Sequence, residues 1–168
     1  VDVLCRAGIG ADLLSISDSL EVTSSHGIHL RCDALASQVD LASYALMFLP
    51  GGMPGTLNLG ASALVTDEVC RRSAAGQPLA AICAAPSILA EHGALQARHA
   101  TANPGFMDAI AAGGALMSEA AVVRDANLIT SRGMGTATEL GFEIVRLLLG
   151  DDAEQVVARV KQGIVYQR

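Results

Sequence analysis

The sequence predicts an α/β fold of the flavodoxin-like type, in which an open, mostly parallel sheet has helices on both faces and forms three α/β/α layers. The first reason is that short apolar segments alternate along the chain with segments of helical periodicity. The second is that 168 residues, of which 51% are hydrophobic, are enough for one domain with a sizeable core. The third is a sharp junction between a strand and a helix at Cys83.

The chain is expected to form a single domain over residues 1–168. A fold of this type opens with a strand, whereas residues 1–7 have the pattern of a helix end that Gly8 closes. We therefore expect the N-terminal strand and the loop after it to be missing from this sequence.

The elements follow in order from their patterns. The predicted strands are apolar runs at residues 12–17, 45–49 and 78–82 and hairpins within 21–31 and 121–131. The predicted helices have apolar residues on one side and cover residues 61–75, 86–92, 105–112, 136–149 and 152–162. Thr136 and Glu139 have the spacing of a capping box, and Asp151 or Asp152 is expected to cap the last helix.

Composition excludes several classes of partner. The formal net charge is -6 and no basic face is visible, so we expect no nucleic-acid partner. The chain is acidic, has 3% aromatic residues and contains no apolar run of roughly 20 residues, so we expect no membrane partner. The four cysteines form no CxxC pair, which predicts neither a metal site nor a disulfide framework and favours a reducing cytoplasm.

The segment around Cys83 is typical of a cysteine nucleophile elbow. A buried strand ends at Ile82, small alanines follow the cysteine, and Pro86 suits the first turn of a helix. Small neighbours allow the strained backbone of such an elbow, and the start of a helix favours the thiolate form of the sulfur. A buried structural cysteine fits this segment equally well, because free cysteine is among the most buried residue types.

Three motifs then give a family resemblance. Residues 81–86 (AICAAP) resemble the AICA(G/A)P signature of the DJ-1/ThiJ/PfpI superfamily. Residues 49–52 (LPGG) match its LPGG loop, with residues 58–59 (NL) at the family's spacing. Residues 130–136 (TSRGMGT) resemble its TSRGPGT turn, with Met134 in place of proline. The order of the motifs is that of the family, and the chain is most similar to bacterial DJ-1-like (YajL-type) proteins.

The resemblance implies roles for individual residues. Cys83 would be the nucleophile and the oxidation-sensitive residue. The backbone N–H groups of Gly51, Gly52 and Ala84 would form an anion pocket, and glycine does allow such a close approach of the backbone. A tight turn after a strand explains the two glycines equally well. The family's glutamate, which hydrogen-bonds the cysteine sulfur, would precede Val1.

The chain departs from the family at histidine positions. Some members carry a histidine 20 residues after the cysteine, where this chain has Asn103, which can contact a substrate but cannot act as a general base. Protease-like relatives carry histidine directly after the nucleophile, where this chain has Ala84. His99 is a further candidate for a substrate contact, against the alternative of a solvated side chain.

Arg132 is a candidate for a further substrate contact. It follows a strand at the ligand-binding edge of such sheets, although an ion-paired arginine fits this position as well.

Three functions follow from the resemblance. The first is cofactor-free handling of a small aldehyde substrate in stress defence, as glyoxalase III-type conversion of methylglyoxal to lactate or as deglycase activity. The second is a non-catalytic redox sensor or chaperone that oxidises at Cys83. The third is a PfpI-like hydrolase or amidase, or an isocyanide-hydratase-like enzyme, although no Cys-His dyad supports a hydrolase. We expect no cofactor, and the family implies a homodimer.

Overall fold

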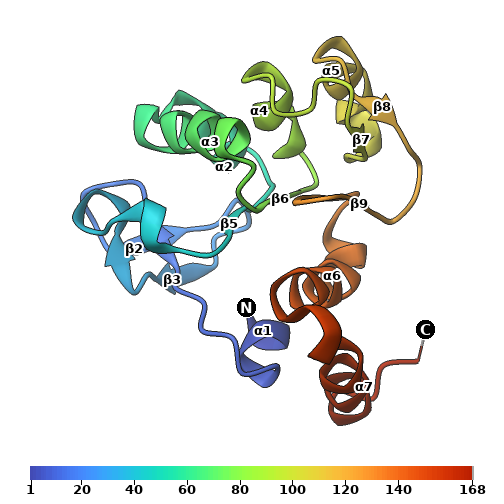
Figure 1. Cartoon of the computed structure of the whole chain (residues 1–168). Coiled ribbons are helices and arrows are strands. Elements are labelled where there is room, and N and C mark those ends of the chain that lie inside the picture. The colour runs from blue at the N-terminus through green and yellow to red at the C-terminus, as the bar shows by residue number, and fades with distance from the viewer. Residues whose placement is uncertain (168) are drawn as a thin grey trace.

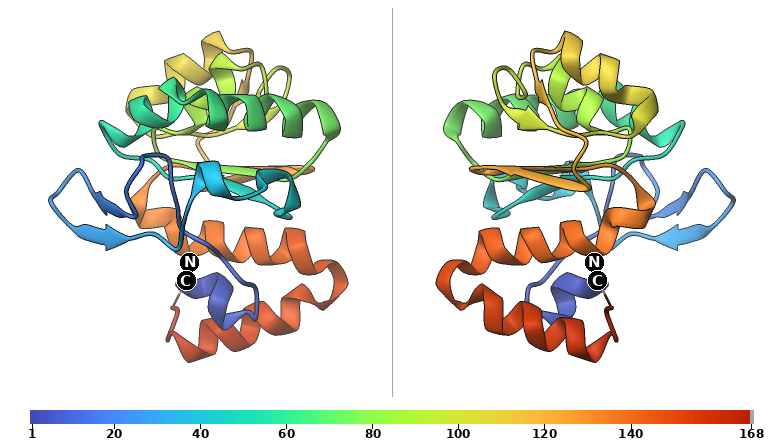
Figure 2. Two further views of the ribbon diagram at one scale, coloured as in Figure 1. Left: turned by 90° about the vertical axis from the view of Figure 1, so that its left-hand side faces the viewer. Right: turned by 90° about the vertical axis from the view of Figure 1, so that its right-hand side faces the viewer.

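Three layers make up the molecule in the computed structural model, which describes residues 1–167 (Figure 1). A sheet occupies the middle layer, and helices cover both of its faces, as the side views also show (Figure 2). A hairpin of two short strands projects beyond one edge of these layers. The three-layer α/β/α prediction is confirmed.

The central sheet has the strand order β5–β6–β10–β9. These strands are β5 (Met47–Leu49), β6 (Leu79–Ile82), β10 (Leu128–Ser131) and β9 (Val122–Asp125). The first three run parallel, and β9 is antiparallel to β10. Strand β6 is buried at all of its residues, which is why it reads as a continuous apolar run in the sequence. Because β6 is an inner strand, its carboxyl end lies between the ends of β5 and β10.

Alternate side chains of β6 pack against the two helical layers. Leu79 and Ala81 belong to the core on the side of α4, whereas Ala80 and Ile82 belong to the core on the side of α6. The helices of the first layer are α2 (Gly55–Ala61), α3 (Ala63–Ala75), α4 (Pro86–Glu91) and α5 (Met107–Ala112). Those of the other layer are α1 (Asp2–Arg6), α6 (Ala137–Leu149) and α7 (Ala153–Gly163).

Short elements complete the fold. The pairs are parallel β1 (Leu14–Ser15) with β4 (Ala34–Leu35), antiparallel β2 (Glu21–Thr23) with β3 (His29–Arg31), and parallel β7 (His99–Ala100) with β8 (Leu116–Met117). Single 3₁₀ turns cover Ala36–Gln38, Leu41–Ser43, Pro104–Phe106, Met134–Thr136 and Gly150–Asp152. The hairpin predicted within residues 21–31 is confirmed, while α2, β4, β7 and β8 were not predicted.

The predicted side-chain capping of the last two helices is wrong. Thr136 and Asp152 do occupy the N-cap positions of α6 and α7, but neither side chain caps its helix. A 3₁₀ turn runs directly into each helix, so both residues have ψ near zero (9° and -8°) rather than the extended backbone from which a side chain reaches back. The Thr136 hydroxyl instead accepts a hydrogen bond from the Gly133 N–H at 3.2 Å and is bonded to the Ser131 hydroxyl at 2.6 Å.

Among the residues that the structure describes, every helix is too short or too polar to cross a membrane.

Candidate active site

Cys83 lies at a strained turn directly after β6. Its φ of 64° is in the left-handed region, which costs an L-residue about 1–2 kcal/mol. The strain persists because the surroundings fix the backbone: the Cys83 N–H donates to the carbonyl of Ser131 at 2.9 Å, and Ala84 and Ala85 are fully packed. The Cys83 side chain itself is only partly buried. The predicted elbow geometry is therefore present.

The loop after β5 lies against this turn. A Cβ atom on Gly51 would come within 2.6 Å of both the Cβ of Cys83 and the carbonyl oxygen of Ile82. Only glycine fits such a contact, because real Cβ atoms do not approach other atoms so closely. Gly52 has a φ of 93°, which glycine adopts without strain. Gly51 is thus needed for the close approach of the two strand ends, whereas a turn with positive φ explains Gly52.

Three backbone donors of this turn and loop are left without a partner in the part of the chain that the structure describes. The N–H groups of Gly51, Gly52 and Ala84 donate no hydrogen bond to any described residue. The Gly52 carbonyl is held at the same time by Thr56, whose backbone N–H and hydroxyl donate to it at 2.8 and 3.0 Å. Unpaired N–H groups in a fixed loop are suited to hold an oxyanion.

Asn103 is fastened to the same turn. Its backbone N–H donates to the carbonyl of Cys83 at 2.9 Å, and its side-chain oxygen accepts from the Gly105 N–H at 3.2 Å. The side-chain nitrogen of Asn103 faces the turn after β10, where it lies 3.8 Å from the position that a Cβ on Gly133 would take. The structure therefore brings Asn103 and the turn after β10 to Cys83, and it leaves the amide nitrogen as a donor.

His99 does not approach Cys83, and that expectation is wrong. Its backbone N–H donates at 2.8 Å to Asp125, which pairs with Leu128 at the start of β10. Leu128 is in register with Leu79 at the start of β6, whereas Cys83 follows the end of β6. His99 thus lies at the opposite edge of the sheet. Its N–H, together with Arg98, holds the pKa of Asp125 below its usual value.

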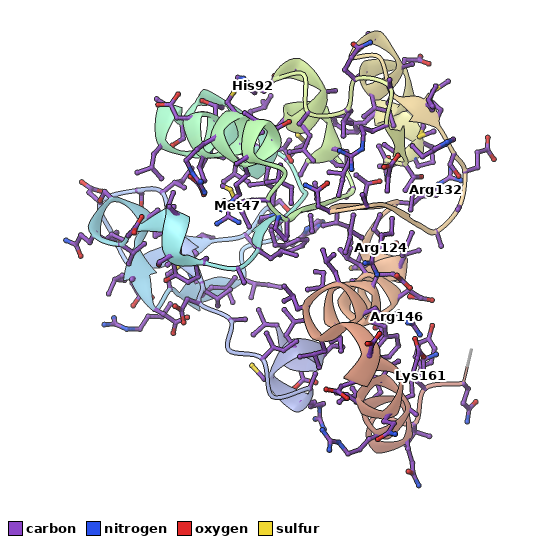
Figure 3. All side chains as sticks on the ribbon, in the orientation of Figure 1. Met47, His92, Arg124, Arg132, Arg146 and Lys161 are labelled. Atoms are coloured by element: carbon purple, nitrogen blue, oxygen red, sulfur yellow. The ribbon has the colours of Figure 1, made fainter. Side chains whose placement is uncertain are left out.

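Arg132 is held by the loop before β9. Its guanidinium donates at 2.8 Å to the carbonyl of Glu119, whose carboxylate is 3.9 Å away. The side chain lies on the β9 side of the molecule (Figure 3). The ion-paired alternative therefore describes Arg132, and its substrate contact is not supported.

The tip of the β2–β3 hairpin reaches the same loop. The hydroxyl of Ser25 lies 3.7 Å from where a Cβ on Gly52 would stand. Ser25 is also hydrogen-bonded to the ring of His26, with 3.2 Å between Oγ and Nδ1. Sequence reasoning missed this neighbourhood. The turn residues predicted the hairpin, but no local pattern shows that its tip meets a loop 25 residues further on.

Two features lie outside the candidate site. A cavity of about 380 Å³ is lined by Arg124, Arg146, Lys161 and neighbouring side chains of β9, α6 and α7 (Figure 3), and Cys83 does not line it. The described residues contain no group of three or more His, Cys, Asp or Glu side chains placed to hold a metal ion.

Comparison with known proteins agrees with this geometry. Residues 1–147 match the sequence model of the DJ-1/PfpI family. The chain belongs to the DJ-1/PfpI family. Within this family it is 35% identical over 158 residues to protein dj-1beta of Drosophila melanogaster, covering 94% of this chain and 84% of the relative. A second relative is the glutathione-independent glyoxalase DJR-1.2 of Caenorhabditis elegans, 30% identical over 151 residues, or 90% of this chain and 80% of the relative.

Solved structures of the DJ-1/PfpI family share the fold. The crystal structure of Drosophila melanogaster DJ-1beta superposes with a TM-score of 0.91 at 33% identity, covering 99% of this chain and 88% of that one. Oxidized Toxoplasma gondii DJ-1 gives a TM-score of 0.90 at 31% identity, with coverage of 99% and 89%. These similarities confirm both the predicted superfamily and the predicted flavodoxin-like architecture.

Proposed function

We propose that the protein converts small reactive carbonyl compounds through Cys83, in the glyoxalase III-type reaction from methylglyoxal to lactate or a related deglycase reaction. One observation carries the proposal: the turn of a strained, partly exposed cysteine packs against the Gly51 loop, and three N–H groups of this turn and loop have no partner among the described residues. Membership of the DJ-1/PfpI family and a relative named as a glyoxalase support it.

The geometry suits the first chemical step. The Cys83 thiolate attacks the aldehyde carbon, and the developing alkoxide is held by the N–H groups of Gly51, Gly52 and Ala84. The resulting hemithioacetal is converted to a thioester, while the neighbouring ketone becomes an alcohol. One carbon is oxidised and the other reduced within the same molecule, so the reaction needs no external oxidant. Water then releases lactate and regenerates the thiol.

Cys83→Ala tests the proposal, with Cys70→Ala as the matched control. Cys70 is an exposed cysteine on α3, outside the candidate site. We expect lactate formation from methylglyoxal, followed by an enzymatic lactate assay, to fall to the background rate in Cys83→Ala and to stay unchanged in Cys70→Ala. Negligible turnover in the wild type and both variants would sink the enzymatic proposal and leave the hypothesis of oxidation sensing at Cys83.

A further inference from the structure

The cavity between β9, α6 and α7 gathers positive charge in an acidic chain. Its volume of about 380 Å³ is near the lower end for pockets that hold small molecules. Arg124, Arg146 and Lys161 line it, three of the 11 lysine and arginine residues of a chain whose formal net charge is -6. Figure 3 shows these three side chains on the same side of the molecule. Arg124 is exposed, so the cavity opens to solvent.

The walls of this cavity are fixed in place. The Arg146 guanidinium on α6 donates at 2.6 Å to Glu154 at the start of α7 and at 2.6 Å to Glu143 on its own helix. Phe142 is 2% exposed in the core between α6 and α7, and the ring of Tyr166 meets it edge-on with 5.1 Å between the centroids. A ligand would therefore enter a preformed site, which lowers the cost of ordering side chains on binding.

Two of the three cations lack an acidic partner. Arg124 donates from Nε to the carbonyl of Ala126 at 3.2 Å and forms no ion pair with a described residue. The Lys161 ammonium lies over both aromatic rings, 5.2 and 5.5 Å from their centroids, and likewise forms no ion pair within the described chain. A hydrogen bond from Arg146 and, more weakly, the charge of Lys161 lower the pKa of Glu154, but Glu154 does not line the cavity.

The lining residues define the class of ligand. Three cations and the two carboxylates of Glu139 and Glu143 line the cavity, which leaves one positive charge in excess among them. A monoanion balances this charge, whereas the two carboxylates would repel the second charge of a dianion. Guanidinium and ammonium groups bind carboxylates through charge-assisted hydrogen bonds. Val122 and the two aromatic rings add apolar surface beside these cations.

We propose that this cavity binds a small monocarboxylate that carries an apolar or aromatic group. Arg124 and Lys161 hold the carboxylate, and the apolar group lies against Val122 and the aromatic rings. The site is separate from the reaction proposed at Cys83, because Cys83 does not line the cavity.

Benzoate is the probe for this class, and isothermal titration calorimetry at pH 7.5 measures its binding to the full chain. Benzyl alcohol has a similar shape without the charge, and phenyl phosphate carries a second charge. We expect saturable binding of one benzoate and at least tenfold weaker binding of the other two probes. The absence of saturable benzoate binding, an equal affinity for benzyl alcohol or a higher affinity for phenyl phosphate would each contradict the proposal.

Charge-removing variants test the two cations. We expect Lys161→Gln and Arg124→Gln each to weaken benzoate binding by about tenfold, because each loses a charge-assisted hydrogen bond. Arg159→Gln is the matched control, since Arg159 is an exposed cation on α7 that does not line the cavity. Equal losses in Arg159→Gln and Lys161→Gln would reveal a general effect of net charge and overturn the site.

NMR locates the probe independently of any turnover. This measurement is needed because the free N–H groups at the Cys83 turn also suit an anion. The chain has three phenylalanines, two tyrosines and no tryptophan, so its ring resonances can be assigned. We expect benzoate to shift those of Phe142 and Tyr166 and to leave Tyr44 in place. Unmoved Phe142 and Tyr166 resonances would refute the site, whereas a wild type that makes no lactate would refute only the reaction at Cys83.

Discussion

Cys83 and Gly51 form one contact in which each residue type is required. The cysteine backbone turns into the left-handed region, and this brings its Cβ to the place that a side chain on residue 51 would occupy. The Cys83 side chain is consequently only partly buried, although it packs against the core on the side of α6. The reactive position is therefore set as much by the missing side chain at Gly51 as by the cysteine.

Gly51→Ala should damage both stability and activity. The new methyl group would lie 2.6 Å from Cys83 Cβ and from the Ile82 carbonyl, so backbone must move, at a cost of about 1–3 kcal/mol. Urea unfolding measures this loss, and methylglyoxal turnover should fall with it. Gly55→Ala is the control, since no atom lies within 4 Å of its added Cβ and alanine favours the helix α2. Equal unfolding free energies for the two variants would contradict the predicted contact.

Site residues were predictable to different degrees. Cys83 and Gly51 carry local signals, namely a strand end followed by small residues and paired glycines. Asn103 was identified only through the family resemblance, as the position at which some members carry a histidine. His99 and Asn103 are only four residues apart, yet the segment between them runs alongside β10, so that His99 lies near the start of that strand and Asn103 at Cys83. The His26 neighbourhood depends on how a hairpin docks, which no periodicity records.

At the scale of elements, one buried guanidinium joins three segments. Arg72 on α3 is only 1% exposed, and it donates to the carbonyls of Leu41 and Tyr44 at 2.8 and 2.7 Å. It also donates to the carbonyl of Pro78 at 3.3 Å and to the carboxylate of Glu68 at 2.6 Å. These bonds fix α3 to the segments that precede β5 and β6, the two strands whose ends carry the site.

Glu68 makes this junction sensitive to acid. Hydrogen bonds from Arg71, and then from Arg72, hold the pKa of Glu68 below its usual value, although burial opposes them. Because the pKa is lower in the folded than in the unfolded state, where it is about 4.3, the carboxylate stabilises the fold above that pH. This stabilisation is lost as the pH falls through the folded-state pKa.

Glu68→Gln should therefore lower the free energy of unfolding at pH 7 by about 1–3 kcal/mol and reduce its dependence on acid pH. Urea unfolding between pH 7 and 3 measures both effects. In Glu154→Gln, the control, an exposed partner of Arg146 is removed, and little change is expected because solvent screens that pair. A constant difference between Glu68→Gln and wild type across this pH range would refute the assignment.

The elements themselves were predicted where burial imposes a pattern. Strand β6 is buried on both faces and α6 on one, and both were found from apolar spacing. Helix α2 was missed because its sequence, GTLNLGA, contains two glycines and an asparagine, which are poor helix formers. Strands of two residues, such as β4 and β7, are too short for an alternation to be seen.

At the scale of the molecule, apolar side chains are exposed on the projecting hairpin. Ile28 is 61% and Leu30 45% exposed, and β3 is exposed at every residue. We propose that a second copy of the chain covers this surface in a homodimer. Ile28→Asp should then yield monomers in sedimentation velocity. Met134→Asp is the control, because Met134 is 92% exposed on the turn before α6 and should leave the assembly intact.

Two results would count against this assembly. The first is that the wild type sediments as a monomer at every concentration tested. The second is that Ile28→Asp sediments as a dimer like the wild type. In either case the exposed Ile28 and Leu30 of the hairpin would need another explanation than pairing of identical copies.

The hairpin joins this surface to the reactive edge, because Ile28 follows directly on the tip that contacts Gly52. Pairing of two copies through β3 would restrict the motion of the tip, and dissociation would release it. By mass action, the alkylation rate of Cys83 would then vary with protein concentration. The abundance of the protein in a cell would thereby set both the number of Cys83 thiols and the rate at which each of them is alkylated.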